Sequence, residues 1–448
     1  MKHITLILLL LIAVSAVSLV GQTSPAPNSQ PASASSQAAT PAPTATVQSR
    51  KITAYTLPPD LYRKARNLSK IHFRLALIGF VYGLIVLWVI LHFRIAPKYR
   101  DWAETFSARR FLQSIVFAPL LLLTTAVMTL PLDIYGEWVE KQYGISVQSW
   151  PSWGWDWIKA ELIGLIIGTI LIWLLYIVIR RSPRRWWFYF WLISIPIGIF
   201  LFFIGPWVID PMFHKFEPLR QKDPELTASL EQMVQRAGEH IPPERMFWMG
   251  AGEKTTDLNA YVTGIGASKR IVVWDTTIAK MNTQQIVFAA AHETGHYVLQ
   301  HIPKLLSVFA VLLLIFFYLG YRSIGWVLTR WGSGWQIRNL EDWASLPALL
   351  LLLSIFSFAA NPVASAISRH YEHQADQYAL EVTHGLTPDS GQVAAQAFQI
   401  LGEVGLSDPE PSPVQVFLFY DHPSIPDRVQ FCLTYDPWAN GGHGEFVK

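Results

Sequence analysis

The run His292-Glu293-Thr294-Gly295-His296 has the residue types and the spacing of a catalytic zinc site. It follows the apolar stretch 287–291, and we expect it to lie on a helix, where residues four apart share a face. His292 and His296 can then bind one Zn²⁺, while Glu293 serves as a base for the attacking water. The alternative is a chance pattern on a surface helix. The neighbouring alanines and a second acidic motif downstream argue against chance.

A zinc hydrolase needs a third protein ligand and an open position for water. The segment 368–376 offers Glu372, with His370 and His373 as competitors. Neighbouring residues such as Glu372 and His373 point about 100° apart on a helix, so they cannot share one inward direction. We favour Glu372 and expect both histidines at the surface. Asp376 shares the face of Glu372 and suits a role in orienting a ligand imidazole.

Three weaker signals lie outside these motifs. His422, followed by Pro423, and Arg428 could supply a positive donor to a tetrahedral oxyanion. The segments 259–264 and 270–274 flank a Gly/Ser turn and predict a β-hairpin, whose strand 259–262 could hold an extended peptide by edge addition. His301 is expected to be structural or interfacial.

The composition is that of a membrane protein. Of the 448 residues, 51% are hydrophobic and only 15% are charged, and the mean hydropathy is +0.28. Apolar runs near the ~20 residues that a bilayer requires occupy 73–93, 111–132, 158–180, 186–209, 305–328 and 345–367. Many of the 19 Trp lie at the ends of these runs, as in an interfacial aromatic belt. We therefore predict an α-helical polytopic membrane protein.

The net charge of +3 is small, and its clusters border the apolar runs. We interpret them as topology signals and expect no nucleic-acid partner. Cys432 is the single cysteine, which excludes an intrachain disulfide and a cysteine-based metal site. Any metal must be held by histidine and carboxylate.

The chain divides into four predicted segments. Residues 1–21 are a signal peptide or a first membrane anchor, with a small-x-small site at Ala16-Val17-Ser18. Residues 22–60 are a Pro/Ala/Ser-rich disordered tether. Residues 61–209 are an N-terminal transmembrane domain of four helices. Residues 210–448 are a zinc metallopeptidase domain that includes two transmembrane helices, about 305–328 and 345–367, and a C-terminal tail.

Several motifs in the same order resemble the type 1 CAAX prenyl proteases, which are integral-membrane zinc metalloendopeptidases. The likeness runs from about residue 110 to the C-terminus. Its motifs are 130–132 with Tyr135, 210–219, 259–261, 270–275, 292–296, Ser368-Arg369 with Glu372 and Asp376, and His422-Pro423 with Arg428.

The resemblance implies both a fold and a set of roles. It implies Glu372 as the third ligand of one Zn²⁺ with Asp376 behind it, Asn259 and Tyr261 as substrate-binding residues, and His422 and Arg428 as active-site groups. It also implies six or seven transmembrane helices around a water-filled chamber, with a zincin-like α+β catalytic domain bearing a small hairpin or sheet at its rim.

The distribution of charge predicts which side of the membrane the site faces. Five Lys/Arg lie in 94–110 and four in 180–185, whereas 133–157 has one Lys against four acids. Positively charged loops stay in the cytoplasm, so the zinc domain is expected on the other side of a plasma or inner membrane. The cations at 63–74 oppose this prediction. Eukaryotic members of the family act on the cytosolic face, and the leader and tether also differ from theirs.

The predicted function is a membrane-embedded zinc endopeptidase, similar to the CAAX prenyl proteases. Its substrates would be peptides or membrane-associated proteins, with or without a lipid. One alternative is a membrane quality-control zinc protease with no role for prenylation. A second is a non-catalytic scaffold with structural zinc, although a structural site has no use for the base Glu293.

Overall fold

The computed structural model describes residues 51–439 and 441–447. Six of its helices are long and apolar enough to cross a membrane, counting only the described residues. They are α2 (Pro59–His92), α4 (Arg110–Tyr143), α5 (Trp150–Arg181), α6 (Trp186–Val208), α11 (His301–Trp331) and α12 (Leu346–Thr383). Each matches one of the six predicted apolar runs to within one residue at either end of the run, or extends beyond it. The predicted anchor or signal peptide at 1–21 lies outside the described residues.

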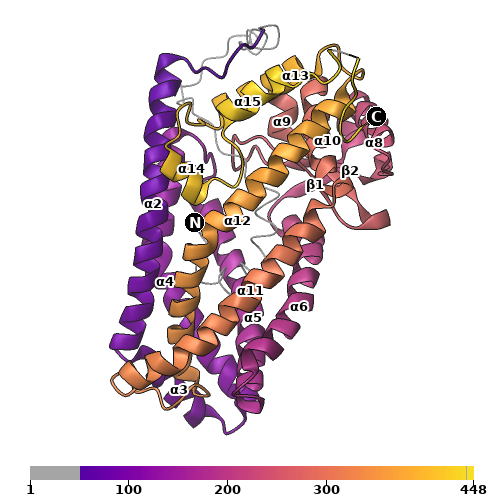
Figure 1. Ribbon diagram of the computed structural model, residues 1–448. Helices are drawn as coiled ribbons and strands as arrows, with labels where there is room; N and C mark the ends of the chain where they lie inside the picture. The colour runs from indigo at the N-terminus through magenta and orange to yellow at the C-terminus, as the bar shows by residue number, and fades with distance from the viewer. Residues whose placement is uncertain (1–50, 440, 448) are drawn as a thin grey trace.

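These six helices form a closed ring. Contacts link α2 to α4, α4 to α5, α5 to α6, α6 to α11, α11 to α12, and α12 back to α2. The ring agrees with the helical barrel that the resemblance implied, and Figure 1 shows the long helices running together along the molecule. Between α2 and α4 lies the short helix α3 (Ile95–Phe106), which the apolar runs did not predict.

One end of the ring is closed by a large apolar core. Side chains from α3 and from the adjacent ends of the long helices pack there around Trp343, which is fully buried. The loops between these helices join one another: Arg100 forms an ion pair with Asp342, with 2.7 Å between nitrogen and oxygen, and Arg180 donates to the carbonyl of Glu341. Both arginine-rich loops therefore lie at this end.

The catalytic elements gather at the opposite end of the ring (Figure 1). A four-stranded sheet has the order β1-β2-β4-β3, from β1 (Lys215–Pro218), β2 (Met246–Gly250), β3 (Ala260–Thr263) and β4 (Arg270–Trp274). β2 and β4 are parallel and the other pairs are antiparallel. The hairpin β3–β4 was predicted. Its turn uses Gly264 at φ +101, where a Cβ would collide with the backbone of Ser268.

Short helices surround the sheet and the site. They are α7 (Leu219–Lys222), α8 (Pro224–Arg236), α9 (Asp275–Lys280), α10 (Thr283–Val298), α13 (Ser390–Val404), α14 (Pro413–Phe419) and α15 (Ile425–Thr434). A second large core joins α8, α10, α13, α15 and the end of α12 with three of the strands. This core fixes α10 against α12, which together carry the predicted zinc motifs.

The predicted tether is wrong over its last ten residues. Ile52 and Tyr55 are buried in the second core, and α2 already begins at Pro59. The side-chain amide of Gln392 on α13 accepts from the backbone N–H of Ile52 and donates to its carbonyl. The side-chain amide of Gln399 makes the same pair of hydrogen bonds with the backbone of Thr56. Residues 51–58 therefore form a docked segment, the N-terminal strap. The rest of the predicted tether, 22–50, lies outside the described residues.

Candidate active site

Helix α10 presents His292 and His296 on one face. The helix starts at a reciprocal cap in which Asn282 and Gln285 exchange side-chain to backbone hydrogen bonds. The two Nε2 atoms lie 3.2 Å apart, one helical turn from each other. Gly295 lies between them on the side of α12, where a Cβ would press on the ring of Tyr378. A larger residue at Gly295 would therefore force α10 away from α12.

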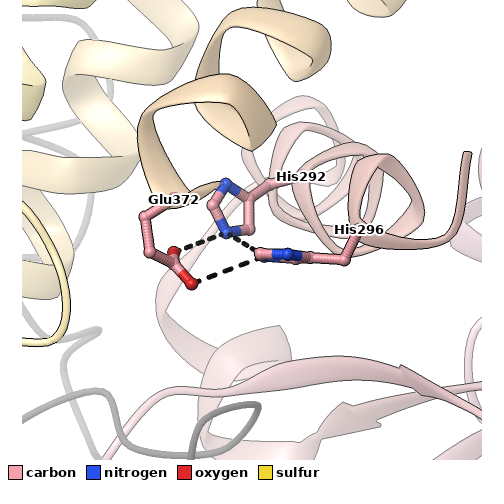
Figure 2. Close-up of side chains that lie close together, drawn as sticks. All are labelled: His292, His296 and Glu372. Atoms are coloured by element: carbon pink, nitrogen blue, oxygen red, sulfur yellow. Dashed lines mark hydrogen bonds and ion pairs between the residues drawn. The ribbon is translucent and has the colours of Figure 1, made fainter. Parts of the chain in front are cut away.

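Glu372 meets both imidazoles from α12 (Figure 2). Its Oε2 lies 3.1 Å from His292 Nε2, and its Oε1 lies 3.5 Å from His296 Nε2. Helix α12 has 38 residues and is about 57 Å long, against a hydrocarbon core of about 30 Å. Glu372 follows the apolar run in the last third of α12, so it reaches the rim of the ring without leaving the helix.

The donor atoms of these three residues fit a metal ion. They lie within 4.8 Å of one another, and no other such cluster of histidine, cysteine and acid occurs in the described ranges. Glu372 Oε2 is buried and forms no hydrogen bond of acceptable geometry, although Nε2 of His292 and Nε2 of His422 lie 3.1 and 3.2 Å from it. Because His292 uses Nδ1 for Asp376, its Nε2 presents a lone pair to that oxygen, an arrangement that only a cation or proton can stabilise.

Asp376 holds the outer side of His292. Its Oδ1 lies 2.8 Å from His292 Nδ1, and Arg428 on α15 binds both carboxylate oxygens at 2.6 and 2.8 Å. All three side chains are buried, and the guanidinium also stacks over the ring of Phe398. The charges of Asp376 and Arg428 thus compensate each other inside the core.

The guanidinium of Arg428 bonds to Asp376 through Nε and Nη2, and Nη2 also lies 3.4 Å from Nδ1 of His292 and 4.0 Å from Oε2 of Glu372. This geometry favours a role in positioning His292. His422 does reach the site, with Nε2 at 3.2 Å from Glu372 Oε2 and Nδ1 at 2.8 Å from Asp421. Burial lowers the pKa of His422, but the carboxylates of Glu372 and Asp421 outweigh it and raise that pKa to about 9.

A small cavity adjoins the three donor residues. Its volume is about 60 Å³, and its lining includes Glu293, Asn259 and His422. Burial raises the pKa of Glu293 to about 7. A larger cavity of about 380 Å³ lies on the other side of His422 and Arg428, between α2 and the loop 405–408. His422 and Arg428 thus line both cavities.

Asn259 and Tyr261 do not share a location. Asn259 lines the small cavity, and its backbone is fixed by the hydroxyl of Thr277. Tyr261 lies within β3 and packs in a separate cluster with Met249 and Val272, on the face of the strand opposite Ala260 and Val262. Its hydroxyl donates to Asp210, which follows α6. Asn259 precedes the first residue of β3, so strand alternation does not fix its direction, and of the two side chains only that of Asn259 lines the cavity.

His301, which was expected to be structural or interfacial, contacts the candidate site. It is completely buried, and its Nδ1 lies 3.1 Å from Nδ1 of His296. It belongs to α11 and not to the helix of His292, because Gln300 adopts a left-handed conformation at φ +56 and ends α10. Neither apolar periodicity nor the motif spacing marks such a break. His370 and His373 are exposed, as expected.

Comparison with known proteins identifies this arrangement. Two family models match the chain. Residues 46–215 match the model of the CAAX prenyl protease N-terminal region, which has five membrane helices, and residues 220–435 match the model of peptidase family M48. A Bacillus subtilis protein named uncharacterized metalloprotease YhfN is 37% identical over 375 residues, covering 84% of this chain and 86% of that protein. The chain belongs to peptidase family M48.

Other M48 relatives extend the match. CAAX prenyl protease 1 of Saccharomyces cerevisiae is 27% identical, covering 85% of this chain and 89% of the yeast protein. The crystal structure of S. mikatae Ste24p superposes with a TM-score of 0.73 at 25% identity, covering 88% of this chain and 94% of that one. The chain is therefore an integral-membrane metalloprotease, and the fold predicted from the sequence is confirmed. The family implies a metal, for which His292, His296 and Glu372 have the donor geometry.

Proposed function

We propose that this M48 protein is a zinc-dependent endopeptidase that cuts membrane-associated peptide substrates. The observation that carries the proposal is the convergence of two imidazoles and one carboxylate beside a cavity that also contains Glu293. Two histidines and one glutamate are a known donor set of hydrolytic zinc. When bound, zinc polarises the peptide carbonyl and lowers the pKa of water towards 7.

Three further side chains have separate roles in the proposed reaction. Glu293 accepts the proton of the attacking water and returns it to the leaving amine, a role for which a pKa near 7 is well matched. His422, held by Asp421, donates to the oxygen that becomes negative. Arg428 acts through Asp376 to fix the ring of His292.

The position of His422 is itself supported from the membrane side. Arg369 on α12 donates to the carbonyls of Val416 and Tyr420. Val416 lies in the last turn of α14, and Tyr420 is the residue that follows this helix. Asn361, further down α12, donates to the carbonyl of Leu418. The loop that carries His422 is thus fastened to the same helix as Glu372.

We propose substrates that approach as extended chains. Strand β3 is an edge of the sheet, and Asn259 lies at its start beside the small cavity. A peptide added to this edge would run past Glu293 and the donor triad. The names of the yeast and other relatives suggest a C-terminal, lipidated peptide as the substrate class. Tyr261 would support the strand from its other face.

The direction that the site faces is part of the proposal. The arginine-rich loops 94–110 and 180–185 lie at the closed end of the ring, opposite the donor triad. Because arginine-rich loops remain cytoplasmic, the site would face away from the cytoplasm of a plasma or inner membrane. Arg63, Lys64, Lys70 and Arg74 on α2 lie on the catalytic side and oppose this orientation.

One experiment separates the candidate functions. The purified full chain is given a peptide in prenylated and unprenylated forms, each with and without a metal chelator. Cleavage that needs both metal and the prenyl group supports the CAAX-type function. Equal cleavage of both forms supports the membrane quality-control alternative. A protein that binds zinc and cleaves neither form would support the scaffold alternative and overturn the proposal.

A further inference from the structure

The two candidate ligand histidines have different partners behind them. His292 is backed by the carboxylate of Asp376, whereas His296 is backed by the neutral ring of His301. The second ring nitrogen of His301, Nε2, lies 3.1 Å from Oε1 of Gln374 on α12. None of the roles proposed for Glu293, His422 and Arg428 involves the contacts that run from His296 to His301 and on to Gln374.

The direction of each hydrogen bond follows from the geometry. Nε2 of His296 faces His292 and Glu372, so it is the nitrogen that must keep a free lone pair for a metal. The proton of neutral His296 then lies on Nδ1 and is donated to Nδ1 of His301. His301 must therefore carry its own proton on Nε2, and that proton is donated to the side-chain oxygen of Gln374. Each donor in the chain has one acceptor.

The backbone places His301 for this contact. The left-handed Gln300 turns the chain sharply between α10 and α11, so the first residue of α11 lies beside the last turn of α10. The imidazole stacks on the ring of Tyr371, with centroids 4.7 Å apart and planes 21° apart. Tyr371 and Gln374 both belong to α12. His301, the first residue of α11, is thus both packed and hydrogen-bonded by α12.

We propose that His301 is a positioning residue, which fixes the tautomer and the ring plane of His296 so that its Nε2 faces the metal. The inference rests on the proposed metal site. Outer partners of metal-binding histidines typically contribute 10–100-fold to metal affinity. Here that contribution comes from the first residue of a membrane-spanning helix and depends on Gln374 of the next.

The test measures zinc release from the purified full-length protein into a competing chelator, without any peptide substrate. His301→Phe keeps an aromatic ring against Tyr371 but removes both hydrogen bonds, and we expect it to release zinc about 10–100-fold faster. His301→Asn can place its amide oxygen near the original Nδ1, and it should stay within a few-fold of wild type. Gln374→Leu should fall between them. The visible spectrum of the Co²⁺-loaded proteins should shift for His301→Phe only.

Backbone variants provide the matched control. Gln300→Gly accepts a positive φ and should release zinc like wild type, whereas the β-branched Gln300→Val should release it faster. Wild-type zinc release by a folded His301→Phe would overturn the inference, as would equal defects in His301→Phe and His301→Asn. A wild-type protein that binds no zinc would instead overturn the proposed function, and this inference with it.

Discussion

The assignment of roles to residues depends mainly on Glu293 and Glu372, two glutamates with different surroundings. Glu372 points at both imidazoles, whereas Glu293 lines the cavity beside them. A carboxylate that binds the metal and a carboxylate that serves as base give different losses when removed. The two substitutions therefore separate metal binding from catalysis.

We predict that Glu293→Gln abolishes peptide hydrolysis and leaves about one zinc per chain. Removal of a general base costs typically 10²–10⁴-fold in rate, and the amide preserves the shape of the side chain. Metal analysis and a cleavage assay on the same preparation provide the test. A folded variant with near-normal turnover would contradict the assigned role.

We predict that Glu372→Ala loses zinc, whereas His370→Ala and His373→Ala retain it. Of Glu372, His370 and His373, only Glu372 contributes an atom to the donor cluster, and the other two side chains are exposed. Asp376→Ala should weaken binding by only about 10–100-fold. The metal content of the purified variants measures this. Loss of zinc from His373→Ala with retention in Glu372→Ala would reverse the ligand assignment.

What the sequence could predict at this scale depends on helical spacing. His292 and His296, and likewise Glu372 and Asp376, are four apart within unbroken helices, so their shared faces follow from the helix period. His301 and Arg428 could not be placed in this way. The position of His301 depends on one left-handed residue, and that of Arg428 depends on how α15 packs on α12.

At the scale of elements, the N-terminal strap joins α2 to the catalytic end. Residues 51–58 lie along α13, whose Phe398 and Leu401 line the small cavity. Tyr55 contacts Gly402 so closely that a Cβ there would overlap the phenol ring. Its hydroxyl donates to the carbonyl of Ser407, 3.0 Å away. The strap thus braces one wall of the proposed site.

We predict that Gly402→Ala destabilises the protein by about 1–3 kcal/mol, because the added methyl group must displace the ring of Tyr55. Gly136→Ala on α4 is the matched control, since no atom lies within 4 Å of its Cβ position. Thermal unfolding in detergent compares the two variants. If Gly402→Ala is as stable as Gly136→Ala, the strap does not pack as described.

The strap shows why composition alone misjudged this segment. The Pro/Ala/Ser-rich pattern favoured disorder up to residue 60, but Ile52 and Tyr55 find partners more than 300 residues away. The residues near Ile52 and Tyr55 in the sequence do not indicate that such distant partners exist. The hairpin β3–β4 was predictable because its strands and its glycine turn are adjacent, whereas the parallel pairing of β2 with β4 was not.

At the scale of the whole molecule, the two ends of the ring differ in charge and in chemistry. Nine Lys/Arg of the loops 94–110 and 180–185 lie at one end, and the donor triad lies at the other. The sequence predicted both features separately. The sequence could not show that the arginine-rich loops and the donor triad occupy opposite ends. This follows only from the arrangement of the helices in the ring, which fixes where each loop lies.

We predict that the catalytic end faces away from the cytoplasm. A cysteine introduced at Glu253, whose side chain is 80% exposed, should react with a membrane-impermeant maleimide in intact cells or spheroplasts. A cysteine at Ser182 should react only after lysis. The native Cys432 is buried and gives little background. The reverse labelling pattern would place the site in the cytoplasm and contradict the charge argument.

The division of the donor triad between α10 and α12 has a consequence for biogenesis. His292 and His296 leave the ribosome before α11, whereas Glu372 follows only after α11 and about two-thirds of α12. Two candidate membrane spans, α11 and the apolar part of α12, therefore separate His296 from Glu372 in the chain. A nascent chain whose hairpin α11–α12 has not inserted therefore lacks a complete site. The donor set of this protein is thus complete only once α11 and α12 have both been made and placed.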